Sequence, residues 1–319
     1  MKYRGVLLGL GAILCGGLFS AVSHAAIYGA DNRRDVHQVD RLQTVGTSVA
    51  VAVGYNLIEP NGDGTNRIAT NGKYGDFVCK DERFVDQPSL GVCSGFLISD
   101  RLLVTAGHCG IPNGIVDNEF HPFCENFRWY FGYQTDRSGA TNHERVPDDK
   151  IYGCKRIIRA ENRMLDEKTE VDGNDFMLIE LDRPVSKDIV PAKIASRATR
   201  VGDPVYTIGF PTGLPAKYSG VSNVVASRMP HYFEVNLDTS SGNSGGPVYN
   251  LKNELVGILV SGYPVDFYED TRLQCSRPNV CDASGKNCRA VSKFNTKQVS
   301  NYIQRIETVL PYVDSRVGR

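Results

Sequence analysis

The sequence predicts an all-β protein that ends in a helix. Between Gly46 and Pro264 the chain consists of short apolar runs separated by Gly, Pro, Asn and Asp, without the i, i+3, i+4, i+7 spacing of long helices. A strong helical pattern occurs only near the end, where Asn295-Thr296 can cap a segment that carries Val299, Ile303, Ile306, Val309 and Leu310. With 319 residues, the chain is long enough for two modest hydrophobic cores.

Eight apolar runs are expected to form strands. They are Ser48–Tyr55, Gly91–Ser99, Leu102–Ala106, Phe176–Leu181, Val205–Ile208, Tyr232–Leu237, Pro247–Tyr249 and Leu255–Val260. Two polar, turn-rich excursions, 110–172 and 263–294, each carry cysteines that could staple them.

The first 25 residues predict an export signal. Lys2 and Arg4 precede an apolar stretch that ends at Ser23-His24-Ala25, with small residues at the two positions that a signal peptidase reads. We expect cleavage after Ala25. An uncleaved membrane anchor is the alternative, but the apolar run barely reaches the ~20 residues of a spanning helix. The mature protein is therefore expected to be secreted or periplasmic and not bound to a membrane.

Charge and cysteine content narrow the functional classes. The 36 Lys and Arg residues balance 36 Asp and Glu residues, which excludes a nucleic-acid binder that works through bulk electrostatics. Removal of the first 25 residues leaves eight cysteines, and an even number behind an export signal indicates disulfides. Metal binding is the competing explanation, but the sequence has no C-x-x-C pair. We therefore expect structural disulfides and neither a metal nor a cofactor.

A glycine-rich segment in the C-terminal half carries a candidate nucleophile. It reads Thr239-Ser240-Ser241-Gly242-Asn243-Ser244-Gly245-Gly246-Pro247-Val248. Glycines beside Ser244 let the backbone approach a reacting carbonyl closely, and the amides of Gly242 and Ser244 can then point together at an oxyanion. A plain Gly/Ser turn is the alternative, because this composition often forms turns.

A candidate general base lies far upstream. His108 follows the expected strand Leu102–Ala106 and comes directly after the small residue Gly107. This arrangement can hold an imidazole at a cleft, where it acts as general base for a serine hydroxyl. Histidines without comparable surroundings are expected to be surface or packing residues, namely His37, His121, His143 and His231.

The two motifs together resemble the chymotrypsin-like (trypsin-fold) serine proteases. T-A-G-H-C after a strand and a later G-N-S-G-G-P occur in that family's order, and the asparagine before the serine is similar to the bacterial glutamyl-endopeptidase-like branch. The resemblance extends thinly from Ile27 to the last helix. It implies two six-stranded antiparallel β-barrels after a signal peptide at 1–25, with the histidine and aspartate in 26–190 and the serine in 191–319.

The resemblance also implies an aspartate that opens a strand between the two motifs and orients the histidine. Asp175 fits this pattern, because Gly173-Asn174 precedes it and the apolar run Phe176–Leu181 follows. Asp166 and Asp172 are rivals, but neither enters a strand.

The roles implied by the family are those of a Ser-His-Asp triad. Ser244 attacks the scissile carbonyl, His108 transfers the proton, Asp175 orients the imidazole, and the amides of Gly242 and Ser244 hold the oxyanion. One departure concerns activation. Trypsin-type zymogens use an aspartate just before the nucleophile to capture a new N-terminal amine, and the neutral Asn243 cannot form that ion pair.

Two disulfides are expected at defined positions. The resemblance implies that Cys93 and Cys109 form the family's histidine-loop bridge, and Cys124 with Cys154 would staple the first excursion. The remaining pairings stay open: two of the three late cysteines pair with each other, and the third pairs with Cys79 or takes another arrangement. The late cysteines are Cys275, Cys281 and Cys288.

The family's substrate pocket has its floor six residues before the nucleophile, which here is Asp238, followed by Thr239. Its edge strand corresponds to Val260, Ser261 and Gly262. A buried unpaired carboxylate is costly, so Asp238 at the floor predicts a preference for Arg or Lys. In the alternative, Asp238 turns away and serves loop structure. Glu specificity is less favoured, because Leu259 replaces the histidine that the glutamyl-specific branch places on the wall strand.

These observations predict a monomeric serine endopeptidase that acts on proteins or peptides and binds no nucleic acid. The alternatives are an endopeptidase with Glu or another specificity, and a catalytically silent binding protein with the same fold. A silent relative would lack a member of the triad, and all three candidates are present.

Overall fold

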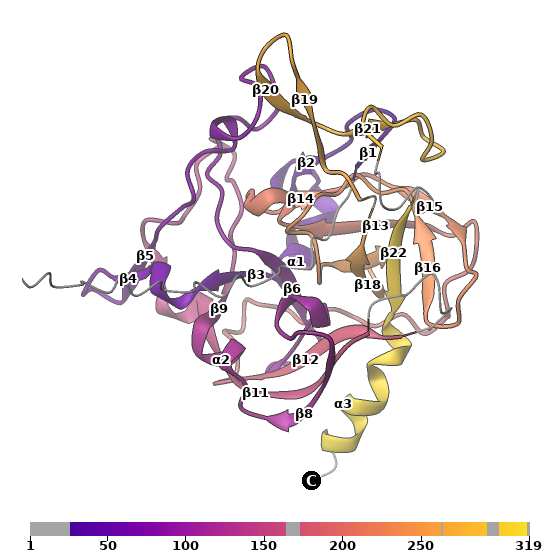
Figure 1. The fold of residues 1–319 in the computed structure, drawn as a ribbon. Coiled ribbons are helices and arrows are strands. Elements are labelled where there is room, and N and C mark those ends of the chain that lie inside the picture. Colours follow the sequence, from indigo (N-terminus) through magenta and orange to yellow (C-terminus); the bar gives the residue numbers. More distant parts are fainter. Residues whose placement is uncertain (1–25, 164–172, 263, 292–299, 318–319) are drawn as a thin grey trace, which may run out of the picture.

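The computed structural model describes residues 26–163, 173–262, 264–291 and 300–317, and it consists mainly of two closed six-stranded antiparallel β-barrels (Figure 1). The predicted fold class is therefore confirmed. The expected signal peptide lies outside the described residues. None of the helices in the described part of the chain is long and apolar enough to cross a membrane.

The first barrel closes because β11 pairs with strands on both sides. In ring order it consists of β3 (Val49–Gly54), β6 (Cys93–Leu97), β7 (Leu102–Thr105), β12 (Asp175–Leu181), β11 (Ile151–Asn162) and β9 (Phe127–Phe131), which pairs again with β3. Strand β8 (Gly114–Glu119) extends β11 outside the ring. The run Val49-Ala50-Val51-Ala52-Val53 in β3 is buried on both faces, which explains why its residues are apolar without alternation.

The second barrel is a ring of the same size. It consists of β13 (Pro204–Gly209), β15 (Ser222–Ala226), β16 (Tyr232–Val235), β22 (Asn301–Arg305), β18 (Leu255–Ser261) and β17 (Pro247–Asn250), which pairs again with β13. Strands β14 (Lys217–Tyr218) and β2 (Arg34–Asp35) extend the sheet beyond β13. The chain ahead of β3 thus adds to the second barrel, although it precedes the first in sequence.

Shorter elements surround the barrels. The strands are β1 (Ile27–Tyr28), β4 (Ile58–Pro60), β5 (Thr65–Ile68), β10 (Val146–Pro147), β19 (Phe267–Asp270), β20 (Cys275–Pro278) and β21 (Val280–Cys281). The α-helices are α1 (Gln43–Gly46), α2 (Pro122–Asn126) and α3 (Leu310–Val317). The 3₁₀ helices are η1 (Val36–Gln38), η2 (Asp40–Leu42), η3 (Tyr55–Leu57), η4 (Tyr74–Asp76), η5 (Gly107–Cys109), η6 (Asp148–Lys150), η7 (Pro211–Gly213) and η8 (Ile306–Thr308).

All eight predicted strands are present, and the chain ends in a helix as predicted, but this helix begins later than expected. Residues 301–305 form β22, which pairs with β16 and β18, and the helix begins only at Leu310. Asn295, Thr296 and Val299 lie outside the described residues. The reason for the difference is tertiary, because a sixth strand is needed to close the second barrel and Ile303 fills its core beside Phe233 and Leu259.

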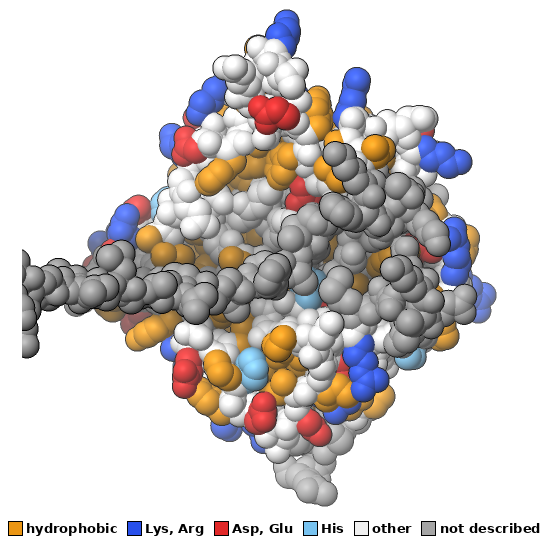
Figure 2. Space-filling view, viewed as in Figure 1, with side chains coloured by type: hydrophobic (Ala, Val, Ile, Leu, Met, Phe, Trp, Pro, Cys, Tyr) orange, Lys and Arg blue, Asp and Glu red, His pale blue; other side chains and the backbone are white. Residues whose placement is uncertain are grey.

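Four disulfides join the described part of the chain. Cys93–Cys109 and Cys124–Cys154 pair as predicted, and Cys281–Cys288 closes a short loop in the second excursion. Cys79–Cys275 spans 196 positions and ties the loop before β6 to the β19–β20 hairpin. Figure 2 shows hydrophobic side chains gathered at the base of this hairpin, where Phe267 packs against a cluster that contains Tyr74 and Leu214.

Candidate active site

The imidazole of His108 is hydrogen-bonded to the carboxylate of Asp175. His108 lies in η5, directly after β7, and Asp175 is the first residue of the neighbouring strand β12. Nδ1 of His108 lies 2.7 Å from Oδ2 of Asp175, and the backbone amide of His108 donates to Oδ1 at 2.9 Å. A carboxylate only accepts hydrogen bonds, so Nδ1 carries the proton and Nε2 is left to accept one.

Two opposing effects act on the pKa of His108. Burial is the larger single effect and lowers the pKa, because the charged imidazolium is poorly solvated. The negative charge of Asp175 and the hydrogen bond to it together outweigh burial and raise the pKa above the ordinary value of 6.5.

Gln304 holds Asp175 in place from the second barrel. Its Oε1 accepts a hydrogen bond from the backbone amide of Asp175 at 2.6 Å, and its Nε2 donates to Asn174 at 3.1 Å and to Thr308 at 2.8 Å. Gln304 belongs to β22 and is fully buried. The strand that closes the second barrel therefore also fixes the start of β12 in the first.

Ser244 lies on a loop whose glycines allow close packing, Gly245 against the first barrel and Gly242 against the chain that follows β13. Gly245 has φ +80°, and a Cβ atom there would lie 2.1 Å from Oγ1 of Thr105 and 2.7 Å from the amide nitrogen of Ala106. Gly242 has φ +96°, and its Cβ would lie 2.4 Å from the carbonyl oxygen of Phe210. Only glycine fits both the backbone conformation and the space, which brings the loop onto the strand that leads to His108.

Ser94 connects this loop to the first barrel by two hydrogen bonds. Its amide donates to the carbonyl oxygen of Ser244 at 2.8 Å, and its hydroxyl donates to the carbonyl oxygen of Gly242 at 2.7 Å. The disulfide sulfur of Cys109 lies 3.7 Å from the same Ser244 oxygen; it carries no proton, so this is a packing contact. Ser244 thereby lies next to the turn that carries His108.

Several polar groups where the Ser244 loop meets the His108 turn have no hydrogen-bond partner among the described residues. Within the described residues, neither Oγ of Ser244 nor Nε2 of His108 has a hydrogen-bond partner, so the two are not bonded to each other. Such bonds are often long in ligand-free sites and tighten with substrate. The amides of Gly242 and Ser244 also donate to no described residue, whereas the side chain of Asn243 accepts the amide of Ser240 within its own loop. A bound oxyanion could therefore take both free amides.

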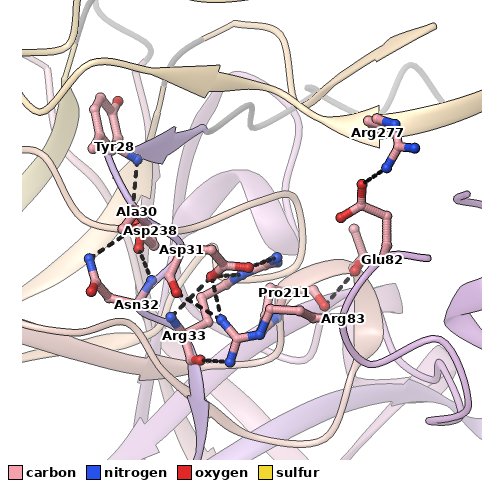
Figure 3. A network of polar contacts seen from close by, with 11 residues as sticks. Tyr28, Ala30, Asp31, Asn32, Arg33, Glu82, Arg83, Pro211, Asp238 and Arg277 are labelled. Atoms are coloured by element: carbon pink, nitrogen blue, oxygen red, sulfur yellow. Dashed lines mark hydrogen bonds and ion pairs between the residues drawn. The ribbon is translucent and has the colours of Figure 1, made fainter. Parts of the chain in front are cut away.

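Asp238 lies among backbone amides of the N-terminal segment. The amide of Tyr28 donates to Oδ1 at 2.8 Å and the amide of Asn32 donates to Oδ2 at 2.7 Å, and the carboxylate is buried (Figure 3). This is the arrangement of the alternative in which Asp238 serves loop structure. The neighbouring residue Thr239 accepts a hydrogen bond from the side chain of Asn301 at 2.9 Å.

The other predicted pocket residues occupy the end of β18. Val260 and Gly262 are buried and Ser261 is partly buried at the point where the strand ends. Leu259 is buried in the second core, and its backbone pairs with Gly245 at 2.7 Å. This strand therefore lies directly beside the loop that carries Ser244.

The other aspartates and histidines considered in the sequence analysis are not seen at this site. Asp166 and Asp172 lie outside the described residues. His37 and His143 contact the hydroxyls of Thr135 and Thr141, and His121 accepts the amide of Phe123 at the start of α2. Among the residues that the structure describes, no group of three or more His, Cys, Asp or Glu side chains could hold a metal ion.

Two β-barrels with a His–Asp pair next to a glycine-rich serine loop are the arrangement of trypsin-like serine peptidases, one of several unrelated folds on which such residues occur. The chain belongs to the trypsin-like peptidase domain family, whose model matches residues 93–258, just over half of the sequence. The matched range includes His108, Asp175 and Ser244.

Curated relatives share only part of this chain. Probable periplasmic serine endoproteases described as DegP-like, from Brucella suis biovar 1 (strain 1330) and Brucella abortus (strain 2308), are each 28% identical over 135 residues. The match covers 37% of this chain and 24% of each relative, so the chain spans about a quarter of their length. A solved Glu endopeptidase in complex with MPD is similar in fold, with a TM-score of 0.50 and 13% identity over 92% of this chain and all of that one.

Proposed function

We propose that the protein is an extracytoplasmic serine endopeptidase. The observation that carries the proposal is the hydrogen bond of 2.7 Å between His108 and Asp175, beside a buried Ser244 whose loop offers two amides that donate to no described residue. A binding protein with the same fold would have no need of a buried His–Asp pair whose Nε2 is bonded to none of the described residues.

The proposed reaction uses only groups of the protein and water. Oγ of Ser244 attacks the scissile carbonyl carbon while Nε2 of His108 takes the hydroxyl proton, and Asp175 stabilises the imidazolium that forms. The amides of Gly242 and Ser244 donate hydrogen bonds to the oxyanion. The imidazolium then protonates the leaving amine as the C–N bond breaks. Water next attacks the acyl carbon while Nε2 of His108 takes its proton, and the imidazolium returns a proton to Oγ of Ser244 as the C–Oγ bond breaks and the carboxylic acid leaves.

The proposed compartment is outside the cytoplasm. Four disulfides join the described part of the chain, and such bonds persist in oxidising compartments. The relatives that match this chain are described as periplasmic, and the first 25 residues predict an export signal. We therefore propose a secreted or periplasmic protein.

Substrate preference depends on which role Asp238 has. At the pocket floor its charge would favour Arg or Lys, as the sequence predicts. Its two hydrogen bonds to the amides of Tyr28 and Asn32 favour the loop-structure role, in which this charge does not face the substrate. A peptide library that varies the residue before the scissile bond separates the two roles, because a selective cut after Arg or Lys supports the pocket role alone.

Labelling with a fluorophosphonate probe tests the nucleophile. The wild type and Ser240→Ala are expected to label at similar rates, because the hydroxyl of Ser240 has no hydrogen-bond partner in the described part of the chain. Ser244→Ala is expected not to label and to lose peptidase activity. Equal labelling of all three proteins would reject Ser244, and a wild type that neither labels nor cleaves peptides would favour a binding protein.

A further inference from the structure

We propose that Asp238 is a positioning residue that ties the N-terminal segment, residues 26–33, to the nucleophile loop, residues 238–245, and so sets the two amides that receive the oxyanion. This inference rests on the proposed peptidase function. It gives Asp238 a role in the speed of the reaction and leaves the choice of substrate to other residues.

The tie consists of hydrogen bonds at the start of the nucleophile loop. Both carboxylate oxygens of Asp238 accept backbone amides, from Tyr28 at 2.8 Å and from Asn32 at 2.7 Å. The next residue, Thr239, donates its amide to the carbonyl oxygen of Ala26 at 3.4 Å. In Figure 3, Tyr28 and Asn32 approach the carboxylate from the same short segment. Residues more than 200 positions apart are therefore held as one unit.

A second set of contacts returns from the same segment to the middle of the loop. Ile27 donates its amide to Asn279 at 2.8 Å, and Asn279 donates its own amide to the carbonyl oxygen of Asp266 at 2.6 Å. The carboxylate of Asp266 accepts both the amide of Ser241, at 3.0 Å, and its hydroxyl, at 2.5 Å. Ser241 immediately precedes Gly242, one of the two oxyanion donors. The N-terminal segment is thus connected to the nucleophile loop at two points, directly at Asp238 and, through residues 266 and 279, at Ser241.

The N-terminal segment is itself held rigidly. The buried guanidinium of Arg33 makes two hydrogen bonds to Asp31, at 2.8 and 2.9 Å, and Arg83 donates to the carbonyl oxygens of Asp31 and Arg33 at 2.8 and 2.6 Å. These contacts surround Asn32, whose amide is one of the two donors to Asp238. Because these contacts hold the donor segment in place, its hydrogen bonds fix the position of the Asp238 carboxylate and therefore the start of the nucleophile loop.

The amides of Tyr28 and Asn32 hold the charge of Asp238 against the effect of burial. The pKa of Asp238 is raised to about 6; burial is the largest cause and Asp31 adds to it, while the two amides and Arg33 lower the pKa. At neutral pH the carboxylate is therefore mainly ionised, and both of its oxygens can accept these amides.

Kinetics of Asp238→Asn test the proposal, with Asp136→Asn as the matched control. Oδ1 of Asp136 also accepts two backbone amides, from Ser138 and Ala140, in an exposed turn that is not part of the nucleophile loop. Losing a hydrogen bond to a charged group at the anchor should lower kcat about 10- to 100-fold and change KM by less than about threefold. Asp136→Asn should match the wild type in both constants.

The split between kcat and KM is the readout that a merely structural role would not give. If Asp238→Asn does not fold, Asp266→Asn removes the second attachment, at Ser241, and should give the same split. A folded variant with wild-type kcat, or one in which KM changes as much as kcat, would overturn the inference while labelling of Ser244 still supported the peptidase.

Discussion

Replacing Gly245 by alanine should separate the proposed nucleophile, Ser244, from the proposed base, His108, without removing either. A Cβ atom at Gly245 would lie 2.1 Å from Thr105, 2.3 Å from the carbonyl oxygen of Ser94 and 2.7 Å from the amide of Ala106. Two of these atoms are backbone atoms of the strands beside His108, so the nucleophile loop has to retreat. Restoring ordinary van der Waals separation requires a movement of about 1 Å.

The expected effect is large for such a small change. A displacement of about 1 Å between reacting groups can lower kcat/KM about 100-fold. The φ of +80° adds a backbone cost of about 1–2 kcal/mol for any residue with a Cβ, which lowers the free energy of unfolding as well. We therefore expect kcat/KM to fall about 100-fold while the protein stays folded, with a free energy of unfolding that is lower by about 1–2 kcal/mol.

Gly202→Ala is the matched control for this experiment. Gly202 has φ +89°, but a Cβ there would meet nothing within 4 Å. It should have the same backbone cost of about 1–2 kcal/mol, measured by urea unfolding, and wild-type kcat/KM in a peptide assay. If Gly245→Ala stays within about threefold of Gly202→Ala in kcat/KM, the contact between the loop and the first barrel does not position the nucleophile.

Two further predictions concern the His–Asp pair. Because neutral His108 is the proposed base, kcat/KM should fall as pH drops through a pKa above 6.5. Asp175→Asn removes the negative charge that raises this pKa, so the midpoint of the fall should move to lower pH. A midpoint that does not move would show that another group raises the pKa of His108. Gln304→Leu should lower the free energy of unfolding by about 3 kcal/mol, because the amide of Asp175 and the side chains of Asn174 and Thr308 lose a buried partner. Urea unfolding within about 0.5 kcal/mol of the wild type would contradict this account.

The sequence alone could predict those parts of the site that depend on neighbouring residues. An apolar strand that ends in small residues before His108, and glycines around Ser244, are local patterns with a direct chemical reason. The strands were predictable on the same ground, because each apolar run is bounded by turn residues. Local patterns failed for β22, whose apolar spacing fits a helix in isolation and a strand in a closed barrel.

The supporting residues could not be predicted, because their partners are remote in sequence. Ser94 contacts Gly242 across 148 positions, and Gln304 contacts Asp175 across 129. The local sequences Cys93-Ser94-Gly95 and Ile303-Gln304-Arg305 carry no sign of such a partner. The only signal is that a polar residue in a buried strand needs one. Asp238 is a similar case, because its position in the motif indicated a pocket floor while its contacts lie with the N-terminal segment.

The bridge between Cys79 and Cys275 has a practical consequence for anyone who purifies this protein. It closes a ring of 196 positions that contains most of both barrels. A single nick anywhere inside that ring, including one that the protein makes in its own copies, leaves the two pieces covalently attached. Gels run without a reducing agent would therefore show one intact band for cut and uncut material alike, and only samples treated with a thiol would reveal self-digestion.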